Sequence, residues 1–89
     1  MSKKLTVLCK VLGNPERVRL VKCLAREMSV SELLEKCDLS QSALSQHLAL
    51  LRSANVLKTR RDGRHIYYRT ASPEYLRLVN LIINLTDVA

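Results

Sequence analysis

The sequence predicts a small, mainly α-helical fold with one β-hairpin, in the order α-α-α-α-β-β-α. Three observations favour this fold. Helix-start signals recur along the chain, a short polar turn joins two amphipathic segments, and an Asp-Gly pair separates two stretches of strand-like residues. Together they indicate a helix-turn-helix followed by a two-stranded wing, the winged helix-turn-helix arrangement. Because the 89 residues contain no repeat and no linker, we expect residues 1–89 to form a single domain.

Two helices are expected in the first third of the chain. The first covers residues 3–12 and stops at Gly13, since glycine favours helix ends. Asn14 is then followed by a proline and an acid, which is the pattern of a capping residue and the first turn of a second helix. We expect this second helix to reach about Glu27. Its predicted buried residues are Val18, Val21, Leu24 and Ala25.

The next two helices are separated by a tight turn. Ser29-Val30-Ser31-Glu32 matches the capping-box pattern, and it predicts a short third helix through about Cys37. Ser40 is placed to cap a fourth helix over about residues 41–54. A short helix, a tight turn and a longer helix form a helix-turn-helix, whose second helix lies in the major groove of DNA.

A hairpin and a last helix complete the predicted fold. The strands Val56–Arg61 and Arg64–Thr70 flank Asp62-Gly63, and this dipeptide is the strongest short-range hairpin signal. Ser72-Pro73-Glu74 then repeats the pattern of cap, proline and acid, so we expect a last helix that extends to about Val88.

Basic charge is concentrated in residues 40–69. This segment contains six Lys or Arg and one acid, so it carries +5 of the net charge of +7, and the remaining residues contribute only +2. A polyanionic partner is therefore expected. Because the charge lies on a strand-turn-strand pattern and not along a free amphipathic helix, we favour double-stranded DNA over a membrane surface.

The fourth helix is predicted to have a core face and a DNA-facing side. At 100° per residue, Leu44, Leu48 and Leu51 fall on one face, opposite a face of small polar residues whose side chains can hydrogen-bond to base edges. The candidate DNA-binding residues on this helix are Gln41, Ser42, Ser45, Gln46 and Arg52. Any solvent-exposed helix also carries such residues, and the adjacent basic hairpin is what favours recognition.

The hairpin tip supplies the second set of candidates. Arg60, Arg61, Arg64 and His65 are expected to contact phosphates or the minor groove, where they would fix the register of the protein more than the sequence it reads. The alternative is a tip that only increases solubility. Tyr67 and Tyr68 should point to opposite faces, so we expect one of them to pack against the core.

The last helix is apolar on more than one side. Its polar residues Arg77, Asn80, Asn84 and Asp87 occupy a wedge of only about 80°. A helix of this kind needs a second surface to pack against. We therefore predict a two-fold homodimer through the first and last helices, which would place two fourth helices on successive turns of a palindrome. The alternative is that these residues cover a small core.

Three stretches, residues 12–21, 40–52 and 60–68, resemble the ArsR/SmtB family of bacterial winged-helix repressors. The resemblance follows the same order over nearly the whole chain. It implies a dimeric repressor that binds an operator overlapping its own promoter and releases this DNA when an inducer is sensed. It also implies that Ser42, Ser45 and Gln46 read bases and that residues 60–64 hold the DNA backbone.

The known inducer sites of the family do not match this chain. Arsenic- and cadmium-type sensors of the family place a Cys-x-Cys pair where this chain has Ser29 and Ser31. Zinc- and nickel-type sensors use Asp, His and Glu on the last helix, and here that helix has no histidine. His47 and His65 stand alone in the sequence, and we expect His47 at the core margin. We therefore expect no metal site and no cofactor, and the inducer is unknown.

The recognition-helix residues 40–48 are closest to a redox- or persulfide-responsive subgroup. That subgroup pairs a cysteine of the second helix with one near the end of the last helix. In this chain Cys23 stands one position later than expected, and no cysteine follows Cys37. Cys23 and Cys9, which have basic sequence neighbours, are candidates for redox sensing, with a structural role as the alternative.

Two other functions remain open. One is a weakly specific architectural DNA-binding protein, and the other is a winged-helix module that binds an acidic protein. We do not expect an enzyme, because the sequence has no phosphate-binding loop, no nucleophile motif and no zinc-protease helix. The N-terminus lacks the apolar core of a signal peptide, and no apolar run has the length of a membrane span, so we expect a cytoplasmic protein.

Overall fold

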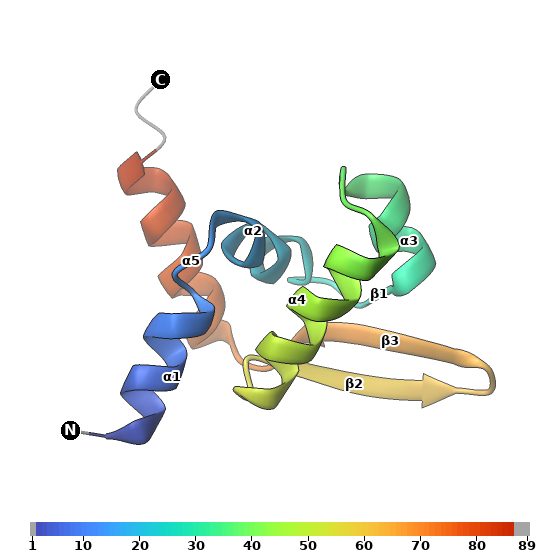
Figure 1. Ribbon diagram of the computed structural model, residues 1–89, viewed down its shortest axis with the longest axis horizontal. Coiled ribbons are helices and arrows are strands. Elements are labelled where there is room, and N and C mark those ends of the chain that lie inside the picture. The colour runs from blue at the N-terminus through green and yellow to red at the C-terminus, as the bar shows by residue number, and fades with distance from the viewer. Residues whose placement is uncertain (1, 87–89) are drawn as a thin grey trace.

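The computed structural model describes residues 2–86, and its elements follow the order predicted from the sequence except for one additional short strand, β1, between α2 and α3 (Figure 1). The helices are α1 (Lys3–Val11), α2 (Pro15–Cys23), α3 (Val30–Lys36), α4 (Gln41–Ser53) and α5 (Pro73–Thr86), and the strands are β1 (Met28–Ser29), β2 (Leu57–Asp62) and β3 (His65–Thr70). The predicted winged helix-turn-helix is confirmed. The last predicted helical residues, Asp87 and Val88, lie outside the described part of the chain.

The capping residues predicted from the sequence start three of the helices. The Asn14 side-chain oxygen accepts a hydrogen bond from the backbone N–H of Glu16 at 2.8 Å. Ser29 and Glu32 form the reciprocal capping box at the start of α3, and Ser40 Oγ accepts from the N–H of Ala43 at 3.1 Å. These bonds satisfy backbone donors that have no partner inside the helix.

The second helix ends at Cys23, earlier than the predicted Glu27, and Ala25 is exposed where burial was predicted. The reason is a contact with a distant strand. The N–H of Thr70 donates to the carbonyl of Leu24 at 2.8 Å, and its buried hydroxyl donates to the carbonyl of Val21 at 2.8 Å. Tertiary contacts thus satisfy the end of α2 and override the helix propensity of the residues that follow.

The predicted two-stranded hairpin is confirmed as β2–β3, and a short strand, β1, that was not predicted pairs with it to form a three-stranded antiparallel sheet. Its strand order is β1-β3-β2, with Met28 opposite Tyr68 on one side and Arg60 opposite Tyr67 on the other. The extra strand, β1, has only two residues, which is too short for a periodic pattern to predict.

The hairpin turn lies one residue later than predicted. Asp62 pairs with His65, so the two-residue loop is Gly63–Arg64. Gly63 has a φ of +63° at the first loop position, as in a type II′ turn, and glycine adopts this conformation without steric cost. Arg64 therefore belongs to the tip itself.

A Schellman motif joins α4 directly to β2. Asn55 has a φ of +62°, the left-handed conformation that ends many helices. Its N–H donates to the carbonyl of Arg52 at 3.0 Å, and the N–H of Val56 donates to the carbonyl of Leu51 at 3.0 Å. Because Val56 is fully buried, the turn is held by packing as well as by hydrogen bonds.

The core lies between the helices and one face of the sheet. Its fully buried members include Leu44 and Leu51 of α4, Leu33 of α3, Leu20 of α2 and Val79 of α5. The core is built from aliphatic residues, with Tyr68 packed against it. The long hairpin extends to one end of the molecule, and α1 and α5 lie at the other (Figure 1). None of the described helices is long and apolar enough to cross a membrane.

Candidate nucleic-acid interface

The outer face of α4 is polar and exposed. The candidates Gln41, Ser42, Ser45, Gln46 and Arg52 are all exposed on this helix, as is Ala49 between them. The opposite face carries three buried leucines, so this face packs against the core and the polar face points to solvent. Side-chain amides and hydroxyls on this surface can donate to and accept from base edges.

A network centred on Arg17 holds α4 against the first two helices. The Arg17 guanidinium donates to the Val11 carbonyl at 2.6 Å and lies 3.3 Å from Nδ1 of His47. His47 is half-buried at the margin of the core, as predicted. The position of α4 is therefore linked to the end of α1, a connection that the sequence pattern did not predict.

The strands of the hairpin place the predicted basic residues on different faces. Register and alternation put Arg61 on the face that carries buried Leu57, which packs towards α4. Arg60 and His65 lie on the opposite, outer face, and Arg64 is in the loop. The two tyrosines also separate as predicted, because Tyr68 packs against the core and Tyr67 faces outward.

On the outer face, Arg60 is bound by an acid from a distant part of the chain. Its Nη2 lies 2.7 Å from Glu27 Oε1, its Nε lies 3.0 Å from Oε2, and its guanidinium carbon is 4.8 Å from the centroid of the Tyr67 ring. The hydrogen bonds with Arg60 hold the pKa of the Glu27 carboxyl below its ordinary value, and they raise the pKa of Arg60 in return. Within the described residues, Arg61 and Arg64 form no ion pair.

Glu27 was not singled out from the sequence, because it was predicted to end α2. The signal that could have identified it is weak. Glu27 directly precedes the short apolar-polar pair that forms β1, and only the pairing of this strand with β3 brings it near the hairpin.

Two of the three cysteines lie on one cavity of about 380 Å³. Cys23 ends α2 and Cys37 caps α3, and both are half-buried there beside the charged residues Arg19, Lys36 and Asp38. Burial, and then the neighbouring Cys23 thiol, raise the pKa of Cys37. Cys9 is exposed on α1. Sequence spacing alone did not predict that Cys23 and Cys37 share a site.

The two serines that stand in place of the Cys-x-Cys pattern, Ser29 and Ser31, have different environments. Ser29 caps α3 through its hydroxyl, and Ser31 is exposed in the first turn of that helix. Among residues 2–86, no three His, Cys, Asp or Glu side chains lie close enough together to hold a metal ion.

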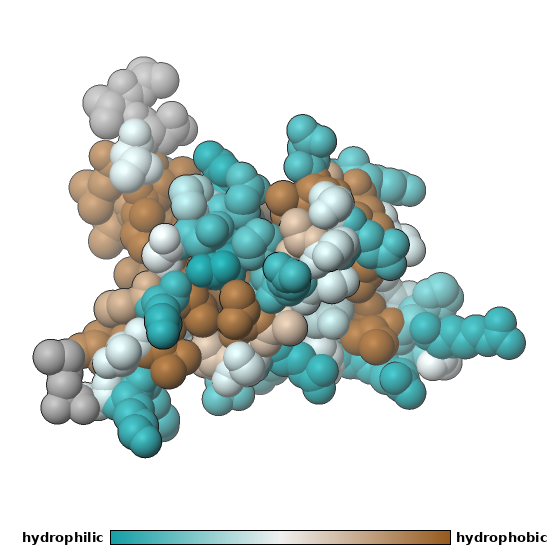
Figure 2. All heavy atoms as spheres, viewed as in Figure 1, coloured by the Kyte–Doolittle hydropathy of each residue, from teal (hydrophilic) through white to brown (hydrophobic). Residues whose placement is uncertain are grey.

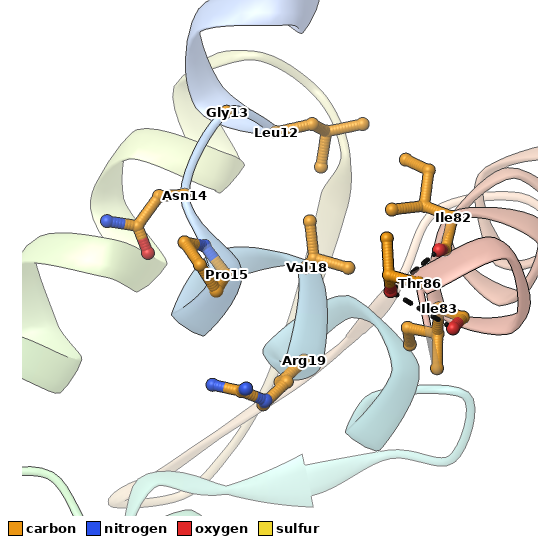
Figure 3. Close-up of a pocket in the computed structure, with 9 residues that line it drawn as sticks. All are labelled: Leu12, Gly13, Asn14, Pro15, Val18, Arg19, Ile82, Ile83 and Thr86. Atoms are coloured by element: carbon orange, nitrogen blue, oxygen red, sulfur yellow. Dashed lines mark hydrogen bonds between the residues drawn. The ribbon is translucent and has the colours of Figure 1, made fainter. Parts of the chain in front are cut away.

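A further cavity lies away from the polar face of α4. It has a volume of about 710 Å³ and is bounded by the α1–α2 turn on one side and the end of α5 on the other (Figure 3). Ile82 and Ile83 line it with Leu12 and Val18, so its walls are largely apolar. The Thr86 hydroxyl donates back to the carbonyls of its own helix at 3.1 Å.

Residues 12–60 match a family model described as a helix-turn-helix domain. The transcriptional activator HlyU of Vibrio cholerae is 39% identical over 85 residues, which cover 94% of this chain and 79% of that protein. The biofilm growth-associated repressor of Agrobacterium fabrum is 41% identical over 86 residues, covering 92% of this chain and 74% of the repressor. The chain spans between 62% and 79% of the length of three such relatives.

A solved structure agrees with these relatives. It is the homodimeric winged helix-turn-helix DNA-binding domain of a Mycobacterium bovis protein, described as a possible ArsR-family transcriptional regulator. It superposes with a TM-score of 0.83 at 27% identity and covers 94% of this chain and 79% of that one.

The chain belongs to the ArsR/SmtB family of winged-helix transcriptional regulators. This confirms the resemblance seen in the sequence and favours a DNA-binding regulator over the architectural and protein-binding alternatives. Within this ArsR/SmtB fold, α4 is the helix that corresponds to the recognition helix and the β2–β3 hairpin is the wing.

Proposed function

We propose that this protein is a sequence-specific, autoregulating repressor that binds a palindromic operator as a homodimer. The observation that carries the proposal is the exposed polar face of α4 beside a basic hairpin that is joined to it through Asn55. A helix of this kind reads bases in the major groove, and a basic hairpin next to it reaches the neighbouring phosphates.

Base reading is assigned to the first half of α4. Ser42, Ser45 and Gln46 lie on its exposed face, and a glutamine side chain can form two hydrogen bonds with adenine. The backbone contacts are assigned to Gln41 at the start of the helix, to Arg52 near its end, and to the hairpin residues Arg61, Arg64 and His65.

The dimer is assigned to the two terminal helices of a single domain, residues 1–89. The exposed fractions of the apolar side chains there are 48% for Leu5, 43% for Val7, 37% for Leu78, 57% for Leu81 and 69% for Leu85. Figure 2 shows apolar surface over α1 and α5 at the end opposite the hairpin. Apolar surface of this kind favours association, and the similar domain from Mycobacterium bovis is homodimeric.

The test is fluorescence-anisotropy binding to the DNA upstream of the protein's own gene, with random DNA as competitor, together with light scattering to measure the mass of the protein. A dimer that prefers the upstream DNA over random DNA by at least about a thousandfold supports the proposal. Weak binding that ignores sequence would contradict it. Repeating the titration with and without reductant tests whether Cys23 or Cys9 senses redox state.

A further inference from the structure

Glu27 and Arg60 connect the two outer strands of the sheet, β1 and β2, across the middle strand, β3. Glu27 directly precedes β1, Arg60 is in β2, and the strand between them, β3, contributes Tyr67. The guanidinium of Arg60 lies over the Tyr67 ring and reaches both oxygens of the Glu27 carboxylate. We call these three residues the outer clasp. The outer clasp attaches β2, the edge strand of the hairpin, to Glu27 in the connection between α2 and β1.

The clasp lies on the face of the sheet that points away from α4. Arg60 is paired with Tyr67, and the next pair along the ladder is Arg61 with Ile66. Side chains of neighbouring positions point to opposite faces. Because Leu57 and Tyr68 face the core, Arg61 shares their side and Arg60 does not. The two adjacent arginines therefore have different surroundings, and only Arg60 lies on the face that Glu27 reaches.

We propose that Arg60 is a positioning residue, which together with Glu27 holds the wing at the angle from which Arg61 and Arg64 reach the DNA. This inference rests on the proposed function, and it replaces the phosphate contact that the sequence predicted for Arg60. An arginine suits this role because its planar fork binds a carboxylate with two hydrogen bonds while its face stacks on an aromatic ring.

The sign of the Glu27 effect separates this role from the alternatives. Removing an acid beside a DNA-binding surface should strengthen DNA binding if only charge matters, because it lowers repulsion from the phosphates. If Glu27 merely competed with phosphate for Arg60, its removal would also strengthen binding. If the outer clasp positions the wing, neutralising Glu27 should instead weaken DNA binding, because the wing then loses its attachment to Glu27.

The test measures the affinity of Glu27→Gln, Arg60→Lys and the double variant for the upstream DNA and for a shuffled duplex. Glu74→Gln is the matched control, because it removes one acid from an exposed ion pair with Arg77 on α5. We expect each clasp variant to bind the upstream DNA about two- to fivefold more weakly, as for loss of one exposed ion pair. The double variant should bind the upstream DNA no more weakly than the single variants do, because either change alone breaks the outer clasp.

Backbone relaxation measured by NMR provides a readout that does not depend on DNA. The heteronuclear NOE of the Gly63 amide should fall in the clasp variants and stay unchanged in Glu74→Gln, because the hairpin tip becomes more mobile on the ps–ns timescale. Arg60→Lys keeps the positive charge, so a simple phosphate contact would survive this change, whereas the bidentate clasp would not.

Two results would overturn the inference. The first is a Glu27→Gln variant that binds the upstream DNA as tightly as wild type, or more tightly. The second is a Gly63 amide whose mobility does not change when the clasp is removed. A wild-type protein that does not prefer the upstream DNA over the shuffled duplex would instead contradict the proposed function, and the NMR measurement would still decide whether the clasp orders the wing.

Discussion

The guanidinium of Arg17 lies 3.3 Å from Nδ1 of His47 and so links α2 to the helix assigned to base reading. Arginine can only donate hydrogen bonds, so the ring nitrogen of His47 is the acceptor in this contact. The same guanidinium donates to the Val11 carbonyl at 2.6 Å. In a continuous helix that carbonyl would accept from the N–H four residues later, but this position is Pro15, which has none. Arg17 therefore supplies the donor that the Val11 carbonyl lacks at the end of α1, and the same side chain contacts His47 of α4.

Replacing Arg17 with Ala should destabilise the fold. The Val11 carbonyl loses its charged donor, and the cost should be about 1–2 kcal/mol. Urea denaturation followed by circular dichroism measures this loss. Arg17→Lys, whose single ammonium cannot reach both the Val11 carbonyl and His47 Nδ1 as the planar guanidinium does, should recover only part of it. An unchanged unfolding midpoint for Arg17→Ala would show that the network contributes nothing to stability.

Replacing Gln46 with Ala should reduce specificity at particular base pairs of the operator. The expected loss is about 1–3 kcal/mol for the cognate base, with little change for DNA that already carries another base there. Competition titrations with single-substitution duplexes measure it. Ser53→Ala, at the last residue of α4, is the matched control. Equal weakening on every duplex would remove Gln46 from the base-reading set.

Replacing Arg61 and Arg64 together with Ala should weaken binding to all sequences alike. The slope of log K against log salt concentration is negative, and each lost phosphate contact reduces its magnitude by about 0.9, so the magnitude should decrease by about 1.8. Anisotropy titrations at several salt concentrations give the slope. The control is Arg19→Ala with Arg77→Ala, which removes the same charge from two exposed helical ion pairs. If the control and the wing variant give the same slope, the wing does not contact phosphates.

Replacing Leu81 with Glu should convert the dimer into a folded monomer. Leu81 is 57% exposed in the single chain, so the change should leave the fold intact and place a charge in the contact between subunits. Light scattering coupled to gel filtration measures the mass. Asn84→Glu adds the same charge to an exposed polar position of the same helix and should remain dimeric. A dimeric Leu81→Glu variant would move the interface away from this part of α5.

Alkylation should distinguish the cysteines. Cys9 is exposed, whereas burial and the adjacent Cys23 thiol raise the pKa of Cys37. Because the thiolate is the reactive form, Cys37 should react with iodoacetamide more slowly than Cys9 near neutral pH, and its rate should rise at higher pH. Mass spectrometry of a time course measures both rates. Faster modification of Cys37 than of Cys9 would contradict this order.

The parts of the fold that depend on neighbouring residues could be predicted from the sequence. The caps at Asn14, Ser29 and Ser40 act within a few residues of the chain, so their patterns are readable in it. The leucine face of α4 follows from helical periodicity. Alternation likewise predicted that Tyr67 and Tyr68 would separate.

Apart from the one-residue shift of the hairpin turn, the parts that were missed depend on contacts between distant residues. Hydrogen bonds from Thr70 stop α2 at Cys23. Glu27 forms its ion pair with Arg60 only because β1 pairs with β3. Cys23 and Cys37 share a cavity because two helices end side by side there. Local patterns carry no information on such contacts, and this is why the sequence did not show that Arg60, and not Arg61, binds an acid.

The tight turn at Asn55 has a consequence for how DNA sequence is selected. Two backbone hydrogen bonds and the buried Val56 hold the start of β2 against the end of α4, so this junction is ordered before any DNA is bound. The duplex then has to adjust its groove width and its bend so that α4 and the wing can contact it at the same time. We therefore expect part of the operator preference to come from base steps that neither element touches, where flexible steps lower the cost of deforming the DNA.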